Sequence, residues 1–171
     1  YRPWRNITKK TMEFFNVRTG IDGQGKPQQV EFPYGSKAQK VRRLDKKAFF
    51  STGKINDAVL FGMDKFNAGS SKAITITEGE LDTMSVYEML GGYPVISVRS
   101  APSAEADCKK HFKYIDSFDK IYLCLDNDEP GQKAMAQVAK LFNPNKTYIV
   151  KMDKFKDANE YLTNTCGTEF K

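Results

Sequence analysis

The sequence has few of the residues that build disulfide frameworks and histidine-rich metal sites. It contains three cysteines, one histidine and one tryptophan among 171 residues. Cys108, Cys124 and Cys166 are too far apart for a zinc module, which needs pairs of ligands at short spacing. An odd and sparse set of cysteines is typical of a reducing compartment. We expect the single histidine, His111, to be a surface or helix residue rather than a ligand.

Long hydrophobic runs are also missing. No apolar stretch reaches the roughly 20 residues of a membrane-spanning helix, so we expect no membrane partner. The first residues, YRPW, include neither a starting Met nor the apolar core of a signal peptide, which suggests a fragment of a longer protein. Hydrophobic residues make up 40% and charged residues 28% of the chain, as in soluble globular proteins.

Positive charge is concentrated in one segment. The formal net charge of the chain is +6, and residues 36–54 account for all of it, with seven Lys or Arg residues against Asp45 alone. A concentrated basic patch indicates a polyanionic partner, with a merely solvated face as the alternative. The candidate nucleotide- or DNA-binding residues are Lys40, Arg42, Arg43, Lys46 and Lys47, together with Lys156 further along the chain.

The first 70 residues predict a small basic α+β unit. Thr8 can cap a helix that runs to about Phe15, and residues 29–34 and 39–44 read as short strands. Residues 20–26 match the GxxxxGK pattern of a phosphate-binding loop, but Pro27 stands where Ser or Thr is needed and a strand follows instead of a helix. We interpret this segment as a hairpin turn.

Residues 71–171 alternate between strand and helix patterns. Strands are predicted at 73–77, 94–98, 120–125 and 147–151, and helices at 80–90, 104–115, 129–142 and 157–162. This rhythm predicts an α/β fold with a mostly parallel, Rossmann-like sheet of about four strands and flanking helices. We therefore divide the chain into a basic unit at 1–70 and an α/β unit at 71–171.

Acidic residues follow several of these strands. Because the carboxyl ends of parallel strands meet at one edge of a sheet, the acids are expected to converge there. Carboxylate oxygens without histidines suit Mg²⁺ or Mn²⁺. Asp128 has a competing explanation, since it can cap the helix that begins at Glu129. The acids are Glu78, Glu80, Asp82, Asp126, Asp128 and Asp157.

Two other acidic motifs agree less well with the sequence. An EF-hand loop needs an oxygen ligand at Pro130 and a Glu at Gln137, so it fails at both positions. An aspartyl phosphatase of the haloacid dehalogenase type also places DxD after a strand, but it usually has Thr or Val where Pro130 stands and uses the first strand of the chain. That class remains only as a weak alternative.

The motifs together resemble a TOPRIM domain, the metal-binding module of bacterial-type primases, topoisomerases and some nucleases. Their order and spacing are most similar to phage bifunctional primase–helicases and their mitochondrial helicase relatives. The motifs are TEGELD at 77–82, YPV at 93–95, DNDEPG at 126–131 and KDANE at 156–160, preceded by KVR at 40–42, STG at 51–53 and LFG at 60–62.

The resemblance implies RNA primer synthesis on single-stranded DNA by metal-dependent nucleotidyl transfer from ribonucleoside triphosphates. It implies that Glu78 is a general base or metal-orienting residue and that Asp126 and Asp128 are the metal-binding pair. It adds Asp82 to the catalytic acids and Asp157 to the metal ligands. Alternatives are a nuclease or topoisomerase-like TOPRIM module that cleaves phosphodiesters, and a non-catalytic module that binds single-stranded DNA inside a replicative helicase.

The resemblance also predicts partners and a setting. Zinc-binding and helicase domains are expected elsewhere in the same full-length protein, which would be hexameric although the fragment is monomeric. The expected location is the cytoplasm of a phage-infected bacterium, or alternatively the mitochondrial matrix. One departure is RSAPS at 99–103, where the relatives have a glycine-rich turn, and Pro102 should make this loop stiffer. Phe49 and Phe50 can stack on bases, with burial in the core as the alternative.

Overall fold

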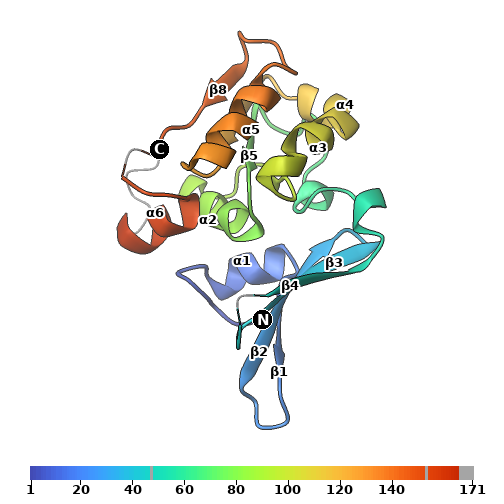
Figure 1. Cartoon of the computed structure of the whole chain (residues 1–171), viewed down its shortest axis with the longest axis vertical. Helices are drawn as coiled ribbons and strands as arrows, with labels where there is room; N and C mark the ends of the chain where they lie inside the picture. Colours follow the sequence, from blue (N-terminus) through green and yellow to red (C-terminus); the bar gives the residue numbers. More distant parts are fainter. Residues whose placement is uncertain (47, 153, 166–171) are drawn as a thin grey trace.

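The computed structural model describes residues 1–46, 48–152 and 154–165 and contains two four-stranded sheets. The sheet from the first part of the chain lies at the bottom of Figure 1, and the α/β layers formed by the second part lie above it. Within the described residues, no helix combines the length and the apolar composition needed to cross a bilayer.

The first sheet is an antiparallel meander in the order β1-β2-β3-β4. A short helix, α1, precedes it, and the Thr8 side chain caps this helix by accepting a hydrogen bond from the Thr11 amide at 3.3 Å, as predicted. The elements are α1 (Lys9–Phe14), β1 (Arg18–Ile21), β2 (Pro27–Tyr34), β3 (Ala38–Arg43) and β4 (Phe49–Gly53).

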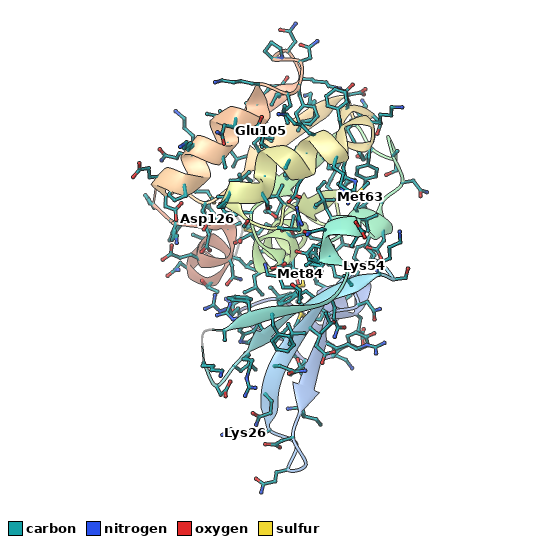
Figure 2. The ribbon with its side chains drawn as sticks, turned by 45° about the vertical axis from the view of Figure 1, so that its right-hand side comes forward. Lys26, Lys54, Met63, Met84, Glu105 and Asp126 are labelled. Carbon is teal, nitrogen blue, oxygen red and sulfur yellow. The ribbon has the colours of Figure 1, made fainter. Side chains whose placement is uncertain are left out.

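The segment that resembles a phosphate-binding loop is a hairpin turn between β1 and β2, which confirms the interpretation above. The Asp22 carboxylate accepts hydrogen bonds from the backbone amides of Gln24 and Lys26, both at 2.9 Å. Figure 2 shows Lys26 at the far end of this hairpin, away from Asp126. No phosphate site is therefore built around this loop.

Strands β1 and β4 were not predicted. All five residues of β4 are exposed, so the strand lacks the alternation of apolar and polar residues that identifies a half-buried strand. β1 pairs only with β2 and contains Gly20 within a turn-rich stretch. Both are edge strands whose pairing depends on their neighbours more than on their own residues.

The second sheet is parallel, in the order β6-β5-β7-β8. Helices α2 and α6 cover one face and share a core with Val95 and Cys124, whereas α3 and α5 cover the other face and pack on Ile76 and Leu123. This confirms the predicted α/β layers. The elements are β5 (Ala73–Thr77), α2 (Glu80–Leu90), β6 (Val95–Ser97), α3 (Ala104–Lys110), β7 (Lys120–Cys124), α5 (Glu129–Ala139), β8 (Thr147–Ile149) and α6 (Ala158–Thr165).

The helix predicted at 104–115 is interrupted. It ends at Lys110, and a second helix, α4 (Phe112–Asp116), begins after His111. The break allows Phe112 to stack on Phe142 with ring centroids 5.3 Å apart, while Ile115 remains fully buried. Single turns of 3₁₀ helix complete the structure at Ile55–Asp57, Met63–Lys65 and Ala101–Ser103.

The two halves share one hydrophobic core. Phe15 and Phe32 from the first half pack in the same buried cluster as Met84 and Val95 from the second, and Phe61 lies between them. The rings of Phe15 and Phe61 stack with centroids 5.4 Å apart. Since burying each large aromatic side chain contributes roughly 3 kcal/mol or more, this contact fixes the halves relative to one another. A division of the chain at residue 70 stays a prediction.

Candidate active site

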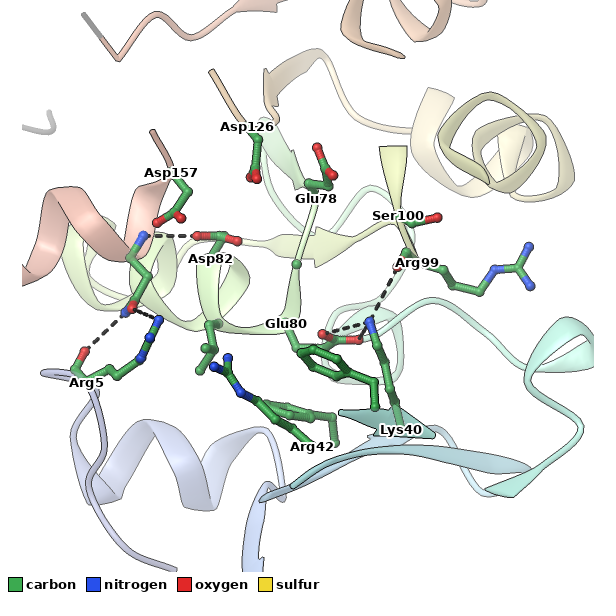
Figure 3. A pocket seen from close by; sticks show the side chains of 15 residues that line it. Arg5, Lys40, Arg42, Glu78, Glu80, Asp82, Arg99, Ser100, Asp126 and Asp157 are labelled. Carbon is green, nitrogen blue, oxygen red and sulfur yellow. Dashed lines mark hydrogen bonds and ion pairs between the residues drawn. The ribbon is translucent and has the colours of Figure 1, made fainter. Parts of the chain in front are cut away.

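A cleft of about 370 Å³ lies between the two halves, at the carboxyl end of the parallel sheet. Figure 3 shows carboxylates along its upper side and basic side chains from the first half along its lower side. We call these the acidic wall and the basic wall. The acidic wall consists of Glu78, Asp82, Asp126 and Asp157, and the basic wall of Arg5, Lys40, Arg42 and Phe49.

Glu78 follows β5 directly, as predicted, and its side chain lies in the cleft. Its Oε1 accepts a hydrogen bond from the Ala101 amide at 3.2 Å. Its Oε2 is buried and has no hydrogen-bond partner within the part of the chain that the structure describes. Burial raises the pKa of Glu78, and the charge of Asp128 adds to the increase. An unpartnered buried carboxylate oxygen is costly unless a cation or a proton binds it.

Asp126 follows β7 and is held close to the start of α5. A Cβ added to Gly131 would lie only 2.2 Å from the Asp126 carbonyl oxygen, so this helix can approach the strand end only with glycine at 131. Burial, followed by the charges of Glu78 and Asp157, raises the pKa of Asp126 to about 7. Asp126 is therefore poised to bind a proton or a cation near neutral pH.

Asp82 extends the acidic wall from the first turn of α2. Its Oδ1 accepts a hydrogen bond from the Asn159 amide at 3.0 Å. Its Oδ2 packs against Gly79, where an added Cβ would approach to 2.8 Å. Burial raises the pKa of Asp82 well above its ordinary value, and the charges of Asp157 and Asp126 reinforce this.

Asp157 and Asp128 both cap helices. Asp157 lies in the cleft and accepts a hydrogen bond from the Glu160 amide at 2.7 Å. Asp128 is the N-cap of α5, with Oδ1 accepting from the Gly131 amide at 3.0 Å, and it forms an ion pair with Lys156 at 3.2 Å. The Gly131 bond lowers the pKa of Asp128. The capping explanation of Asp128 is thus correct, and its metal-binding role stays a prediction.

The acidic wall fits a divalent cation chemically. Its donors are carboxylate oxygens, and three of its four members have raised pKa values that a bound cation would lower again. The unpartnered oxygen of Glu78 is a free ligand position. Among residues 1–46, 48–152 and 154–165, however, no three such side chains are already arranged around one ion position.

Glu80 lines the cleft with the other acids, as expected, but its carboxylate is turned toward the basic wall. It is 5% exposed and points toward the first half, where it accepts a hydrogen bond from the Tyr34 hydroxyl and forms an ion pair with Lys40 at 3.0 Å. The direction is set by helix geometry, because a residue two positions before Asp82 faces another side of α2. Glu80 therefore connects α2 to the basic wall through its ion pair with Lys40, and it does not extend the acidic wall.

Arg42 is held on the basic wall between two aromatic rings. Its guanidinium lies 5.1 Å from the centroid of Trp4 and 5.4 Å from that of Phe49. Burial and the charge of Arg5 lower the pKa of Arg42, and no carboxylate in the described ranges forms an ion pair with it. A rigid guanidinium without a carboxylate partner is a suitable receptor for phosphate.

The other predicted basic residues lie outside this wall. Arg43 follows Arg42 on β3, so its side chain faces the opposite side of the sheet, where it pairs with Asp45 at 2.7 Å. Lys46 is exposed, and Lys47 lies outside the described residues. Lys156 pairs with Asp128 at the edge of the acidic wall.

Phe49 and Phe50 also face opposite sides of the sheet, as Arg42 and Arg43 do. Phe49 lines the cleft opposite Arg42, whereas Phe50 pairs with Val41 on the outer face of the sheet. Both are about half exposed, at 48% and 45%, so neither belongs to the core. Of the two, only Phe49 lies where stacking on a bound nucleotide is possible.

Trp4, Arg5 and Asn159 were missed as site residues. Arg5 lies over the same Trp4 ring as Arg42, at 5.3 Å, and its Nη1 donates to Asn159 Oδ1 at 3.3 Å. Arg5 and Asn159 both line the cleft. An aromatic residue next to a basic one in WR was the available signal, but nothing in the sequence placed it beside β3.

Polar contacts connect the loop at 99–103 to the surrounding protein. Arg99 pairs with the buried Asp107 at 2.6 Å, and Pro102 lies within the 3₁₀ turn Ala101–Ser103. The amide of Ala101 holds Glu78. The stiffness expected from Pro102 stays a prediction.

Residues 75–162 match the Toprim-like family. The chain is 36% identical over 125 residues to the DNA helicase/primase of Enterobacteria phage T3, an alignment that covers 72% of this chain and 21% of the phage protein. It is 29% identical over 182 residues to the chloroplastic/mitochondrial Twinkle homolog protein of Arabidopsis thaliana, covering 92% of this chain and 25% of that protein. The chain therefore spans about a quarter or less of the length of these relatives.

The fold is similar to a solved structure of a related domain. The crystal structure of the primase fragment of the bacteriophage T7 primase-helicase protein superposes with a TM-score of 0.83 at 33% sequence identity. The superposition covers 94% of this chain and 67% of that one. Both the antiparallel and the parallel sheet therefore lie within the similarity.

Proposed function

Because the chain belongs to the Toprim-like family, we propose that it is the primase domain of a primase–helicase and synthesises short RNA primers on single-stranded DNA. One observation carries the proposal. A desolvated acidic wall faces an unpaired arginine within one cleft of about 370 Å³, a size that accommodates a nucleotide. Nucleotidyl transfer needs both features, since phosphate charge must be bound and neutralised where a hydroxyl is activated.

Glu78 and Asp126, with Asp82 and Asp157 beside them, would hold Mg²⁺ or Mn²⁺. When bound, such an ion stabilises negative charge on the phosphate oxygens. Glu78 would orient this ion or accept the proton of the attacking 3′-hydroxyl, since its carboxylate lies in the cleft directly after β5. The predicted roles of Asp128 as a ligand and of Lys156 as a phosphate contact remain part of the proposal.

The basic wall would bind the nucleotide. Arg42 and Arg5 both line the cleft with their guanidinium groups against the Trp4 ring, and they would bind the triphosphate. Lys40 is neutralised by Glu80 and would add less charge. Phe49 would stack on a base. Arg43 and Lys46 would contact template phosphates outside the cleft, and template binding is also the role proposed for Lys47.

The alternative functions have less support. A topoisomerase needs a tyrosine nucleophile, and no tyrosine of the described chain lines the cleft. Tyr122 stacks on Tyr148, and the Tyr114 hydroxyl donates to the Phe66 carbonyl. A non-catalytic DNA-binding module would have no need for three carboxylates with raised pKa values. The proposed partners are a single-stranded template, ribonucleoside triphosphates, and zinc-binding and helicase domains of a hexameric full-length protein.

The proposed setting is the cytoplasm of a phage-infected bacterium. The T3 phage relative supports it, while the Arabidopsis relative keeps an organellar protein as the second candidate. Detection of the gene for the full-length chain in a phage genome would decide between them.

Incorporation of labelled ribonucleotides on single-stranded DNA with Mg²⁺ tests the function. Glu78→Gln and Asp126→Asn should each abolish dinucleotide synthesis, a loss of about 1,000-fold or more, because they remove charge without changing shape. Glu105→Gln is the matched control, since Glu105 forms an exposed ion pair with Lys109 on α3 and does not line the cleft. Full synthesis by the Glu78 or Asp126 variant would refute the assignment.

A further inference from the structure

Asn159 is a buried polar residue to which the proposed chemistry gives no role. It lies in the first turn of α6 and is 3% exposed. A buried amide needs partners for its donors and its acceptor. The partners of Asn159 come from two segments far away in the sequence, one at the start of the chain and one on α2.

The side chain of Asn159 bonds to Arg5 at two points. Nδ2 donates to the Arg5 carbonyl oxygen at 3.1 Å, and Oδ1 accepts from Arg5 Nη1 at 3.3 Å. Nδ2 also donates to Ser85 Oγ at 2.9 Å, whose own proton goes to the Leu81 carbonyl at 2.7 Å. Because the Ser85 proton is already used, its oxygen must accept, and this fixes the orientation of the Asn159 amide.

The segment that Asn159 holds is a tight turn with a disfavoured backbone. Trp4 and Ile7 pair across it through hydrogen bonds of 3.2 and 3.0 Å. The central residues, Arg5 and Asn6, have φ angles of 50° and 61°, which are uncommon outside glycine. The turn therefore depends on contacts with the rest of the protein, and its bond to Asn159 is one of them.

Arg5 also needs a restraint for electrostatic reasons. It shares the Trp4 ring with the partly buried Arg42, and the two like charges repel each other, which adds to the effect of burial in lowering the pKa of Arg42. The backbone amide of Asn159, in turn, donates a hydrogen bond to the carboxylate of Asp82 in the acidic wall. The dashed lines at Arg5 and at Asp82 in Figure 3 mark these bonds. Asn159 thus links the turn to the acidic wall.

We infer that Asn159 is a positioning residue for nucleotide binding, whose side chain keeps the Arg5 guanidinium on the cleft against repulsion from Arg42. The inference rests on the proposed function in one respect, namely that Arg5 contacts the phosphates of the nucleotide. Asn159 itself touches no substrate.

Calorimetric titration with ATP and Mg²⁺ tests this directly. Asn159→Ala retains the backbone amide that binds Asp82 and removes only the bonds to Arg5 and Ser85. We expect it to raise the Kd for ATP about 10-fold, as for the loss of a charge-assisted contact. Asn164→Ala, an exposed position on the same helix, should change the Kd less than about twofold.

A double-mutant cycle separates positioning from a merely structural role. If Asn159 acts through Arg5, adding Asn159→Ala to Arg5→Ala should weaken ATP binding less than about twofold further. Fully additive losses, or an unchanged Kd in a folded Asn159→Ala variant, would overturn the inference. If Asn159→Ala fails to fold, Asn159→Ser serves instead, because it is too short to reach Arg5. No ATP binding by the unmodified chain would contradict the proposed function instead.

Discussion

The two walls of the cleft hold their charges in different ways. The carboxylates of the acidic wall lie at strand ends and first helical turns, and burial, reinforced by neighbouring carboxylates, raises the pKa values of Glu78, Asp82 and Asp126. Among the cations of the basic wall, Lys40 and Arg42 lie on β3 and Arg5 lies in the turn before α1, and the rings of Trp4 and Phe49 lie against them. The difference indicates separate roles, in which the acidic wall catalyses the reaction and the basic wall binds the nucleotide.

Gly131→Ala tests whether catalysis depends on the position of Asp126 in the acidic wall. The new Cβ would lie 2.2 Å from the Asp126 carbonyl, so α5 or the strand end must shift. We expect kcat for dinucleotide synthesis to fall at least about 100-fold, since displacements of about 1 Å have such effects. Steady-state kinetics measures this.

Gly23→Ala is the control for that substitution. Gly23 has no atom within 4 Å of its added Cβ and lies in the distant hairpin turn. Activity should remain within about twofold of the unmodified chain. Equal effects of both substitutions would show that the acidic wall is not specifically sensitive to the position of α5.

Glu80→Gln tests the link between the walls. It leaves Lys40, which is only 20% exposed, without its negative partner. Removing one member of such a partly buried pair should lower the free energy of unfolding by about 3 kcal/mol. Chemical denaturation gives the value. Glu105→Gln breaks an exposed helix pair with Lys109 and should cost less than about 0.5 kcal/mol. Similar losses for both variants would mean that Glu80 does not join the walls.

The stability of the folded protein should depend on pH, because buried carboxylates lie close together in the acidic wall. Without metal, the folded protein binds more protons than the unfolded chain between pH 4 and about 7, because the pKa of Asp126 rises to about 7. Stability should therefore decrease as the pH rises through this window. Melting curves in a chelator between pH 5 and 8 would show a Tm that falls by a few degrees.

Asp126→Asn provides the comparison for the pH profile. The amide cannot ionise, so the decrease in Tm across the same pH window should become smaller. A profile with the same slope in both proteins would place the titrating group elsewhere.

The acidic wall could be predicted from the sequence because its residues follow strands. A buried apolar run identifies β5 or β7, and the residue after it necessarily lies at the carboxyl edge of a parallel sheet. This reasoning correctly brought Glu78 and Asp126 together. It did not give the direction of the Glu80 side chain, because the direction of a residue in the following helix depends on where that helix packs.

The sequence predicted a cluster of Lys and Arg residues in the first half of the chain, but not which of them face the cleft. Whether Arg42 or Arg43 faces the cleft depends on strand register, which a fully exposed partner strand such as β4 does not reveal. The contribution of Arg5 depends on a turn that packs on β3 from the start of the chain. Contacts of this kind are set by tertiary structure and leave no periodic signal.

The most direct test of the separate roles of the two walls compares Arg42→Ala with Asp126→Asn in steady-state dinucleotide synthesis and in ATP binding. Arg42→Ala should raise the KM for ATP about 10-fold with little change in kcat, whereas Arg18→Ala, at an exposed position of the edge strand β1, should leave both nearly unchanged. Asp126→Asn should abolish kcat and still bind ATP. If Arg42→Ala instead lowered kcat without changing KM, or if Asp126→Asn retained normal kcat, the two walls would not have the separate roles described.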